Sequence, residues 1–265
     1  MFILLQKIVP QHLLSRLVGL VAASEISLIK RWFIQFAIAR YKVDLSEAAE
    51  PDPDQYRSFN DFFTRALRPG VRPISGEFCS PADGEISQLG HITAGTLLQA
   101  KGVTYSLAKL LGAPEVSAYE NGSFITVYLS PKDYHRVHSP VSGRLTTARY
   151  IPGKLFSVNQ QTTEAITDLF AINERLVMDF TTEHGAVSVV MVGAMIVAGI
   201  QPVWRDTVYR AGEFATEAPD MEITAGDELG RFLMGSTAIV VSEKPLSFYH
   251  KAGDTLRMGE SLLTQ

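Results

Sequence analysis

The chain has 265 residues, of which 46% are hydrophobic and 20% charged, enough for a large buried core; its length alone does not divide it into two domains. Its formal net charge of -4 argues against a nucleic-acid-binding protein, in which a strong basic excess is expected. The single cysteine, Cys79, excludes a disulfide framework and a metal site built from cysteine pairs, and it fits a reducing compartment.

The first 42 residues carry an opposite charge balance to the rest. They contain six Lys and Arg residues against Glu25 alone, so the acidic excess lies in the remainder of the chain. A basic, apolar segment on an acidic body is attracted to anionic lipid, although an ordinary basic surface on a core helix pair has the same composition. The N-terminus lacks the basic leader and uninterrupted apolar stretch of a secretory signal, so we do not expect export.

Two amphipathic helices are predicted in this basic segment. Apolar residues at spacings of three and four predict a helix over 11–24, with Pro10 where a proline is tolerated at a helix start. A second helix is predicted over 25–41, with Ile29, Trp32, Phe33 and Phe36 on one face. Charges interrupt both before the roughly 18 apolar residues that a bilayer span requires. We therefore predict that residues 1–45 lie in the membrane interface; packing on the body or on a second copy is the alternative.

The remainder of the chain shows the sequence pattern of short β-strands. Residues 45–60 are polar and read as a connection, followed by a short helix near 59–65 with Ser58 as its N-cap. Beyond Pro73, short β-type runs alternate with Gly, Pro, Asn and Asp. The clearest runs are 123–129, 143–151, 187–200 and 237–242, with helical interruptions near 105–112 and 160–172. The prediction is an α+β fold: a mostly antiparallel β catalytic body over 46–265 with an N-terminal amphipathic helical region over 1–45.

Three stretches hold residues able to do chemistry. Asp83 lies in a turn before a strand, His135 and His138 lie three residues apart after a strand, and Gly235-Ser236-Thr237 precedes a β-branched run. Each alone has an ordinary explanation. Asp-Gly is a common turn dipeptide, and the two histidines lack a third ligand, so no metal is expected. The Gly-x-Ser-x-Gly elbow of a serine hydrolase does not occur in the sequence.

Taken together and in this order, the three stretches resemble the phosphatidylserine decarboxylase family in its bacterial membrane-associated form. One departure is Met234, where the family usually has Leu; the two side chains are close in volume. The resemblance covers nearly the whole chain, in the blocks 59–63, 72–74, 81–84, 99–102, 129–138, 150–153, 155–159, 173–175, 192–194 and 235–237.

The resemblance implies a zymogen that cleaves itself between Gly235 and Ser236 into a β chain, 1–235, and an α chain, 236–265. It assigns Ser236 as nucleophile, His138 as its base and Asp83 as the residue that orients His138, with the division of roles found in serine proteases. Attack on the preceding carbonyl gives an ester. Loss of the α-proton then expels the carboxylate and leaves dehydroalanine, which hydrolyses to a pyruvoyl group with release of ammonia.

The resemblance further implies that this pyruvoyl group, derived from Ser236, forms a Schiff base with the serine amine of phosphatidylserine and accepts electrons as carbon dioxide departs. The product is phosphatidylethanolamine. His135 is expected to return a proton to the substrate carbon, although His138 could do both jobs and His135 could orient the headgroup. The implied partners are phosphatidylserine in an anionic membrane, the two chains of one precursor, and a second processed protomer in a homodimer. The implied location is peripheral, on the cytoplasmic side of the cell membrane.

Two functions of other classes stay open. A membrane-associated Ser-His-Asp lipid hydrolase would keep the chain intact and use Ser236 at every turnover. A non-enzymatic β domain anchored by its helices would leave the three chemical stretches as coincidence.

Overall fold

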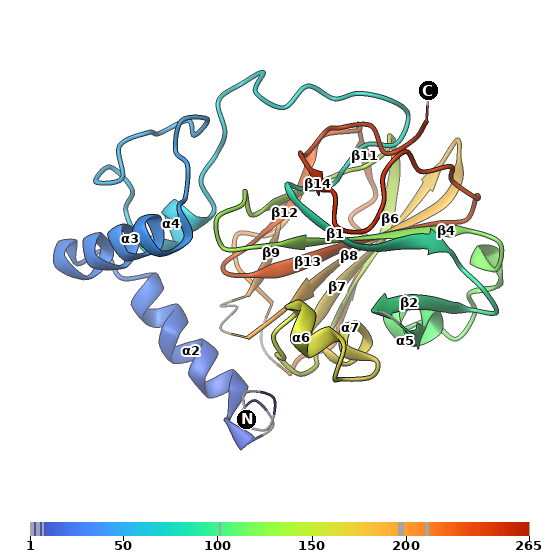
Figure 1. Cartoon of the computed structure of the whole chain (residues 1–265), viewed down its shortest axis with the longest axis horizontal. Coiled ribbons are helices and arrows are strands. Elements are labelled where there is room, and N and C mark those ends of the chain that lie inside the picture. The colour runs from blue at the N-terminus through green and yellow to red at the C-terminus, as the bar shows by residue number, and fades with distance from the viewer. Residues whose placement is uncertain are drawn as a thin grey trace.

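A helical region lies beside a β body in the computed structural model, which describes residues 3, 6, 8–100, 102–195, 199–209 and 212–264 (Figure 1). Lys101 of the resembling block 99–102 lies outside these residues, as do residues 196–198 of the run 187–200. The strands of the body pair in antiparallel fashion. The predicted α+β class is confirmed.

The body is built on a nine-stranded sheet with a smaller sheet and a hairpin. The large sheet runs in the order β10-β6-β7-β8-β13-β4-β1-β14, with β11 also paired to β6. Its strands are β10 (Ala215–Glu217), β6 (Gly143–Ile151), β7 (Arg175–Thr182), β8 (Gly185–Gly193), β13 (Ser236–Ser242), β4 (Ser123–Leu129), β1 (Gly84–His91), β14 (Thr255–Leu256) and β11 (Met221–Ile223). The small sheet consists of β5 (Arg136–His138), β12 (Glu228–Phe232) and β9 (Ile200–Pro202), and the hairpin of β2 (Thr96–Ala100) and β3 (Val103–Ser106).

The helices confirm most of the predicted boundaries. The N-terminal region contains α2 (Gln11–Ala22), α3 (Ser27–Tyr41) and α4 (Phe59–Phe63), and the Ser58 side chain accepts a hydrogen bond from the Asp61 amide at 3.2 Å as the predicted N-cap. The predicted helical interruption near 105–112 is the short helix α5 (Leu107–Leu111). The one near 160–172 contains two short helices, α6 (Gln160–Thr163) and α7 (Leu169–Ile172), and a 3-10 turn spans Ser117–Tyr119.

Both faces of the large sheet are covered, which explains the continuous apolar run of β13. Ala238 and Val240 belong to one apolar cluster, and Ile239 and Val241 to a second cluster on the other face. All seven residues of β13 are buried. A strand buried on both faces has no need of polar alternation, so β13 lies at the centre of the body.

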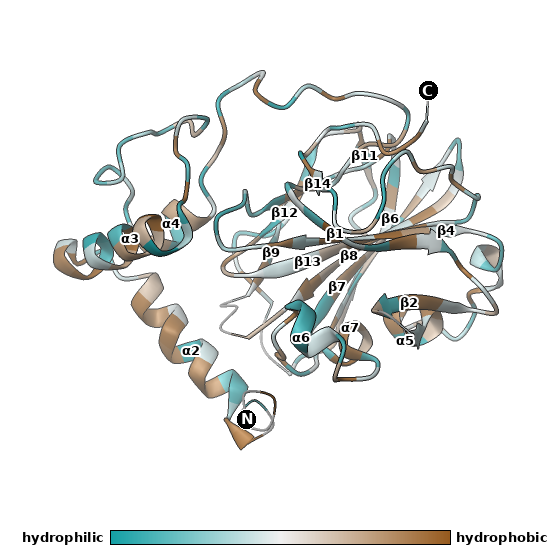
Figure 2. Ribbon diagram, viewed as in Figure 1, coloured by the Kyte–Doolittle hydropathy of each residue, from teal (hydrophilic) through white to brown (hydrophobic). Residues whose placement is uncertain are grey.

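The helical region turns its apolar side chains outward. The buried residues of α2 are Gln11, Ser15 and Ala22, whereas Leu13 and Leu20 are 55% and 73% exposed. This inverts the usual arrangement of a surface helix, whose apolar stripe faces the core. Figure 2 shows brown, hydrophobic stretches along α2 and α3 away from the sheets.

The predicted single apolar face of α3 is divided between two environments. Trp32 is 62% exposed and stacks on Phe36 with ring centroids 5.6 Å apart. Phe33 instead packs against Phe59 of α4, and the fully buried contacts of α3 are made by Ile34 and Ala37. Helical periodicity alone does not say which part of an apolar face another element covers.

A third apolar cluster joins the helices to the segment that follows them. It contains Ala22, Ile34, Ala37, Val43, Tyr56, Phe59, Phe62 and Phe63. Packing of the helical region therefore continues past residue 45, and the division into 1–45 and 46–265 stays a prediction. Within the described ranges no single helix is long and apolar enough to cross a membrane; α2 and α3, bent by 110°, pass that test only as a pair, by length and composition.

Candidate active site

The three chemical stretches converge at one end of the large sheet. Ser236, the first residue of β13, lies opposite Leu129 of β4 and Gly193 of β8. In the next row, Tyr128 of β4 lies between Thr237 of β13 and Glu85 of β1. Because β1 and β13 are both antiparallel to β4, both begin at this end, two strand spacings or about 10 Å apart. Asp83 directly precedes β1, and the histidine loop leaves β4 here.

Ser236 is fully buried, and its hydroxyl is free. Its Oγ has no hydrogen-bond partner among the described residues. Alternation along β13 places its side chain on the face of Ala238, whose cluster also contains Val137 and Phe232 of the small sheet. A Cβ added at Gly235 would meet no heavy atom within 4 Å. The Gly235–Ser236 peptide thus joins an uncrowded residue to a buried, uncommitted hydroxyl.

The loop that carries the histidines is held by two charged side chains. The Asp133 carboxylate accepts hydrogen bonds from the amide and hydroxyl of Ser130, at 2.8 and 2.6 Å. Arg65, which follows α4, donates through Nη2 to the carbonyl of Lys132 at 2.9 Å. Burial is the largest cause of the raised pKa of Asp133 and of the lowered pKa of Arg65. These contacts fix the loop just before His135.

His135 presents one free ring nitrogen in a dry setting. Its Nδ1 lies 2.8 Å from the Asp133 carbonyl and therefore carries the proton, while its Nε2 has no partner among the described residues. The ring packs against Phe63 with centroids 4.0 Å apart. Burial lowers the pKa of His135 to about 3. The His135 carbonyl accepts from the Phe232 amide at 3.0 Å, which places this neutral ring beside the segment leading to Ser236.

His138 has both ring nitrogens engaged. Nδ1 lies 2.8 Å from the carbonyl of Gly226, and Nε2 lies 3.0 Å from the hydroxyl of Tyr134. Burial lowers the pKa of His138, while the Gly226 carbonyl acts in the opposite direction. In the described part of the chain no hydrogen bond joins this ring to Ser236 or to Asp83. The role of His138 as base stays a prediction.

Asp83 is held by an arginine. Its carboxylate accepts from Arg72 Nε at 2.9 Å and Nη2 at 2.5 Å, and from the amide of Met258 at 2.7 Å. Arg72 also pairs with Glu47 at 2.8 Å, and its hydrogen bond with Asp83 is the largest cause of its raised pKa. The turn that carries Asp83 does contact the histidine strand, since the amide of His138 donates to the Pro81 carbonyl at 2.8 Å. The structure thus brings these segments together, without the predicted Asp83–His138 contact.

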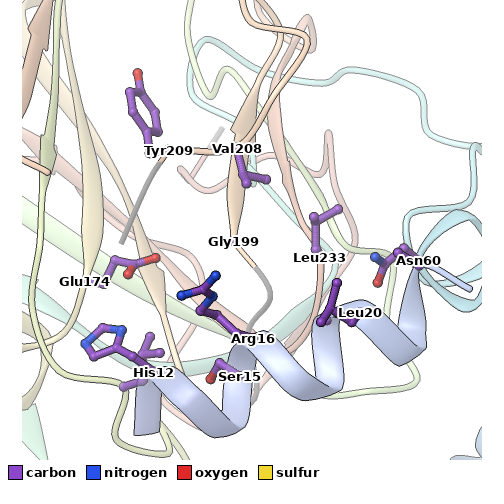
Figure 3. Close-up of a pocket in the computed structure, with 13 residues that line it drawn as sticks. His12, Ser15, Arg16, Leu20, Asn60, Glu174, Gly199, Val208, Tyr209 and Leu233 are labelled. Carbon is purple, nitrogen blue, oxygen red and sulfur yellow. The ribbon is translucent and has the colours of Figure 1, made fainter. Parts of the chain in front are cut away.

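A cavity of about 630 Å³ opens beside this end of the sheet, between α2 and the body (Figure 3). Leu233, two residues before Gly235, lies on its wall. Glu174 also lines it, and the Glu174 carbonyl accepts from the amide of Gly193, the residue opposite Ser236. The remaining lining residues are His12, Ser15, Arg16, Gly19, Leu20, Ala23, Asn60, Leu155, Gly199, Val208 and Tyr209.

Comparison with known proteins assigns a family to this arrangement. The phosphatidylserine decarboxylase family model matches residues 59–264, and a second model, described as PSD, matches residues 1–42. The chain belongs to the phosphatidylserine decarboxylase family. It is similar to proteins named phosphatidylserine decarboxylase proenzyme from Acinetobacter baylyi (52% identical, covering 99% of this chain and 94% of the relative) and Acinetobacter baumannii (49%, 99% and 95%). A protein of the same name from Saccharophagus degradans is 48% identical over 99% of this chain and 96% of its own length.

Membership makes the chain a decarboxylase, and the name of its relatives fits a precursor that is processed. Sequence reasoning found Asp83, His135, His138 and Ser236 but missed the side chains that hold them: Arg65, Arg72 and Tyr134. Arg72 and Tyr134 lie inside resembling blocks and Arg65 two residues beyond one, which is the signal that could have drawn attention to them. Within the described ranges no group of three or more His, Cys, Asp and Glu residues could hold a metal ion.

Proposed function

We propose that this chain converts phosphatidylserine to phosphatidylethanolamine and carbon dioxide, after cleaving itself between Gly235 and Ser236 and converting Ser236 to a pyruvoyl group. The observation that carries this proposal is the buried, unpartnered hydroxyl of Ser236 at the first position of the central strand, where the Asp83 and histidine segments meet. Membership in the family and the proenzyme names of the relatives support it.

The residues around Ser236 fit such a group. The β13 backbone is paired on both sides at this position, to Leu129 and Gly193, so a group formed at residue 236 is held in place by strand pairing. The open space at Gly235 leaves room for the new end of the longer chain to move away. When formed, the pyruvoyl group supplies an electrophilic carbonyl that takes up the substrate amine and the electrons released as carbon dioxide departs.

The chain's own residues divide the proton transfers between them. His138 accepts the proton of Ser236 once its Nε2 exchanges the Tyr134 hydroxyl for the serine, and Asp83, fixed by Arg72, supplies a nearby negative charge that favours the protonated ring. His135 holds its only proton on Nδ1, so its free Nε2 first takes up a proton from water and then passes that proton to the substrate carbon.

Two variants separate these roles. His138→Ala is expected to leave the chain intact, whereas His135→Ala is expected to be cleaved but to release no carbon dioxide from phosphatidylserine. Intact mass and carbon dioxide release are measured on the same samples. Normal cleavage of His138→Ala would remove His138 from the role of base, and normal carbon dioxide release by His135→Ala would remove His135 as proton donor. An intact parent chain labelled at Ser236 by a fluorophosphonate would favour a lipid hydrolase instead.

We further propose that the helical region docks on the cytoplasmic face of the cell membrane as a peripheral element. Ten of the fourteen exposed large hydrophobic residues of the described chain lie between Ile8 and Tyr41. The same region carries the basic excess of the sequence, so it combines apolar side chains with attraction to anionic lipid. The cavity that Leu233 lines is walled in part by α2, so this docking brings a lipid substrate toward the site.

A further inference from the structure

The cavity beneath α2 contains polar groups to which the described residues offer no partner. Ser15 is 5% exposed and lines the cavity, yet its Oγ makes no hydrogen bond among the described residues. Asn60 of α4, which also lines the cavity, has a side-chain oxygen with no partner among the described residues. Leaving a buried polar group unpaired costs free energy, so two of them around one cavity indicate a polar ligand.

A positively charged side chain, that of Arg16, lines the same cavity. Arg16, one residue after Ser15, lines the cavity and makes no ion pair or hydrogen bond within the described ranges. Figure 3 shows its guanidinium projecting from α2 toward the wall that carries Glu174 and Gly199. A guanidinium binds phosphate oxygens through parallel hydrogen bonds, which makes arginine a preferred residue for phosphate recognition.

The cavity has an acidic end as well, on the side of Ser236. Glu174 is 5% exposed, and burial raises the pKa of its carboxyl. Its carbonyl is bonded to Gly193, which lies opposite Ser236. Arg16 and Glu174 therefore offer a cationic and an acidic side chain to a phospholipid headgroup, whose phosphate and amino group are separated by two carbon atoms. The exposed apolar residues of α2, such as Leu20 at the cavity, offer the acyl chains a path outward.

We propose that Arg16, with Ser15, binds the phosphodiester of a glycerophospholipid in this cavity and thereby directs the headgroup amine toward Ser236. The identity of the lipid rests on the proposed function, whereas the phosphodiester site rests on the cavity itself. Arg16 acts here as a positioning residue.

Binding to an uncleaved chain tests this without any turnover. The Ser236→Ala precursor is titrated with dihexanoyl-phosphatidylserine below its micellar concentration, by calorimetry, and separately with inorganic phosphate. Adding Arg16→Gln is expected to weaken lipid binding about tenfold, because a charge-assisted hydrogen bond is lost. Arg57→Gln is the matched control, since the Arg57 side chain is exposed and lies outside the cavity.

Equal affinities of the Arg16→Gln and Arg57→Gln chains would overturn the proposal, and so would absence of lipid binding by the Ser236→Ala precursor. Inorganic phosphate bound as tightly as the lipid would overturn the phospholipid assignment. None of these outcomes depends on cleavage or decarboxylation, so failure of the proposed function is scored separately by mass and carbon dioxide release.

Discussion

At the scale of single residues, the site is defined by which polar atoms are satisfied and which are not. Ser236 Oγ and His135 Nε2 are buried and have no partner in the described part of the chain, whereas the ring of His138 and the carboxylate of Asp83 are fully engaged. Buried polar atoms are normally paired, so the free ones mark where chemistry can occur. The engaged ones mark contacts that the proposed self-cleavage requires the protein to exchange.

Burial of His135 predicts a dependence of stability on pH. The unfolded chain binds a proton on this ring below about pH 6.5, whereas the folded chain, with its lowered pKa, does not, so folding stability is lost as pH falls below that value. Between pH 7.5 and 5.5 this loss is about 1.4 kcal/mol for His135. Urea unfolding of the Ser236→Ala chain at both pH values, with and without His135→Gln, measures it. If the loss of stability between the two pH values is as large in His135→Gln as in the exposed-site control His91→Gln, the prediction is contradicted.

The Arg72–Asp83 pair predicts a structural cost. Arg72→Gln leaves the partly buried carboxylate of Asp83 without its cation and Glu47 with Arg257 alone, and should destabilise the Ser236→Ala chain by about 3 kcal/mol. Arg144→Gln is the control, because Arg144 also pairs with two carboxylates, Asp220 and Glu222, but in an exposed setting where such pairs contribute little. Urea midpoints compare them, and equal midpoints for the two variants would refute the importance of the buried pair.

At the scale of elements, the pairing of β13 would keep the two chains of the proposed self-cleavage together. Residues 236–265 contain β13, paired along its whole length to β4 and β8, and β14, paired to β1. Cleavage before Ser236 therefore cuts the chain at the edge of a central strand and removes none of its pairing. The two fragments are held together by the sheet.

The central position of β13 predicts that one truncated side chain in this strand lowers the free energy of unfolding substantially. Ile239 is fully buried, so Ile239→Ala should cost about 2–5 kcal/mol of unfolding free energy in the Ser236→Ala chain. The control is Tyr249→Ala in the same 30-residue segment, where the side chain is 74% exposed and a change within about 0.5 kcal/mol is expected. Urea unfolding compares the two. Near-equal stabilities would show that β13 does not hold the segment in place.

The limits of the helices and strands were predicted from the sequence much better than the contacts that these elements make. The limits of β4 and β6 coincide with the predicted runs, because β-branched and aromatic residues bounded by turn residues leave little choice. The three-residue strands β5 and β9 carry too few residues to show a period and were missed. The structure brings the segments of the predicted site residues to one end of the sheet, and their roles stay predictions. The contact of His138 with Gly226 joins residues 88 apart in sequence, which no local pattern encodes.

At the scale of the whole molecule, the proposed membrane docking depends on the exposed apolar residues of the helical region. The outward apolar faces of α2 and α3 predict binding to vesicles that contain anionic lipid. Replacing Leu28 and Trp32 together by Ser should weaken this binding at least tenfold, since each buried side chain contributes about 1.5–3 kcal/mol. The matched control replaces Phe214 and Tyr249, exposed on the body, by Ser. Equal losses in vesicle co-sedimentation would place the contact surface elsewhere.

The most direct test of the account is the intact mass of the purified chain. Self-cleavage through an ester and dehydroalanine takes up one water and releases one ammonia, so the two fragments should together exceed the precursor by about 1 Da, whereas ordinary hydrolysis would add about 18 Da. The account predicts fragments 1–235 and 236–265 with the smaller mass sum, and a single intact chain for Ser236→Ala. A parent protein that remains intact, or fragments whose sum shows simple hydrolysis, would contradict it.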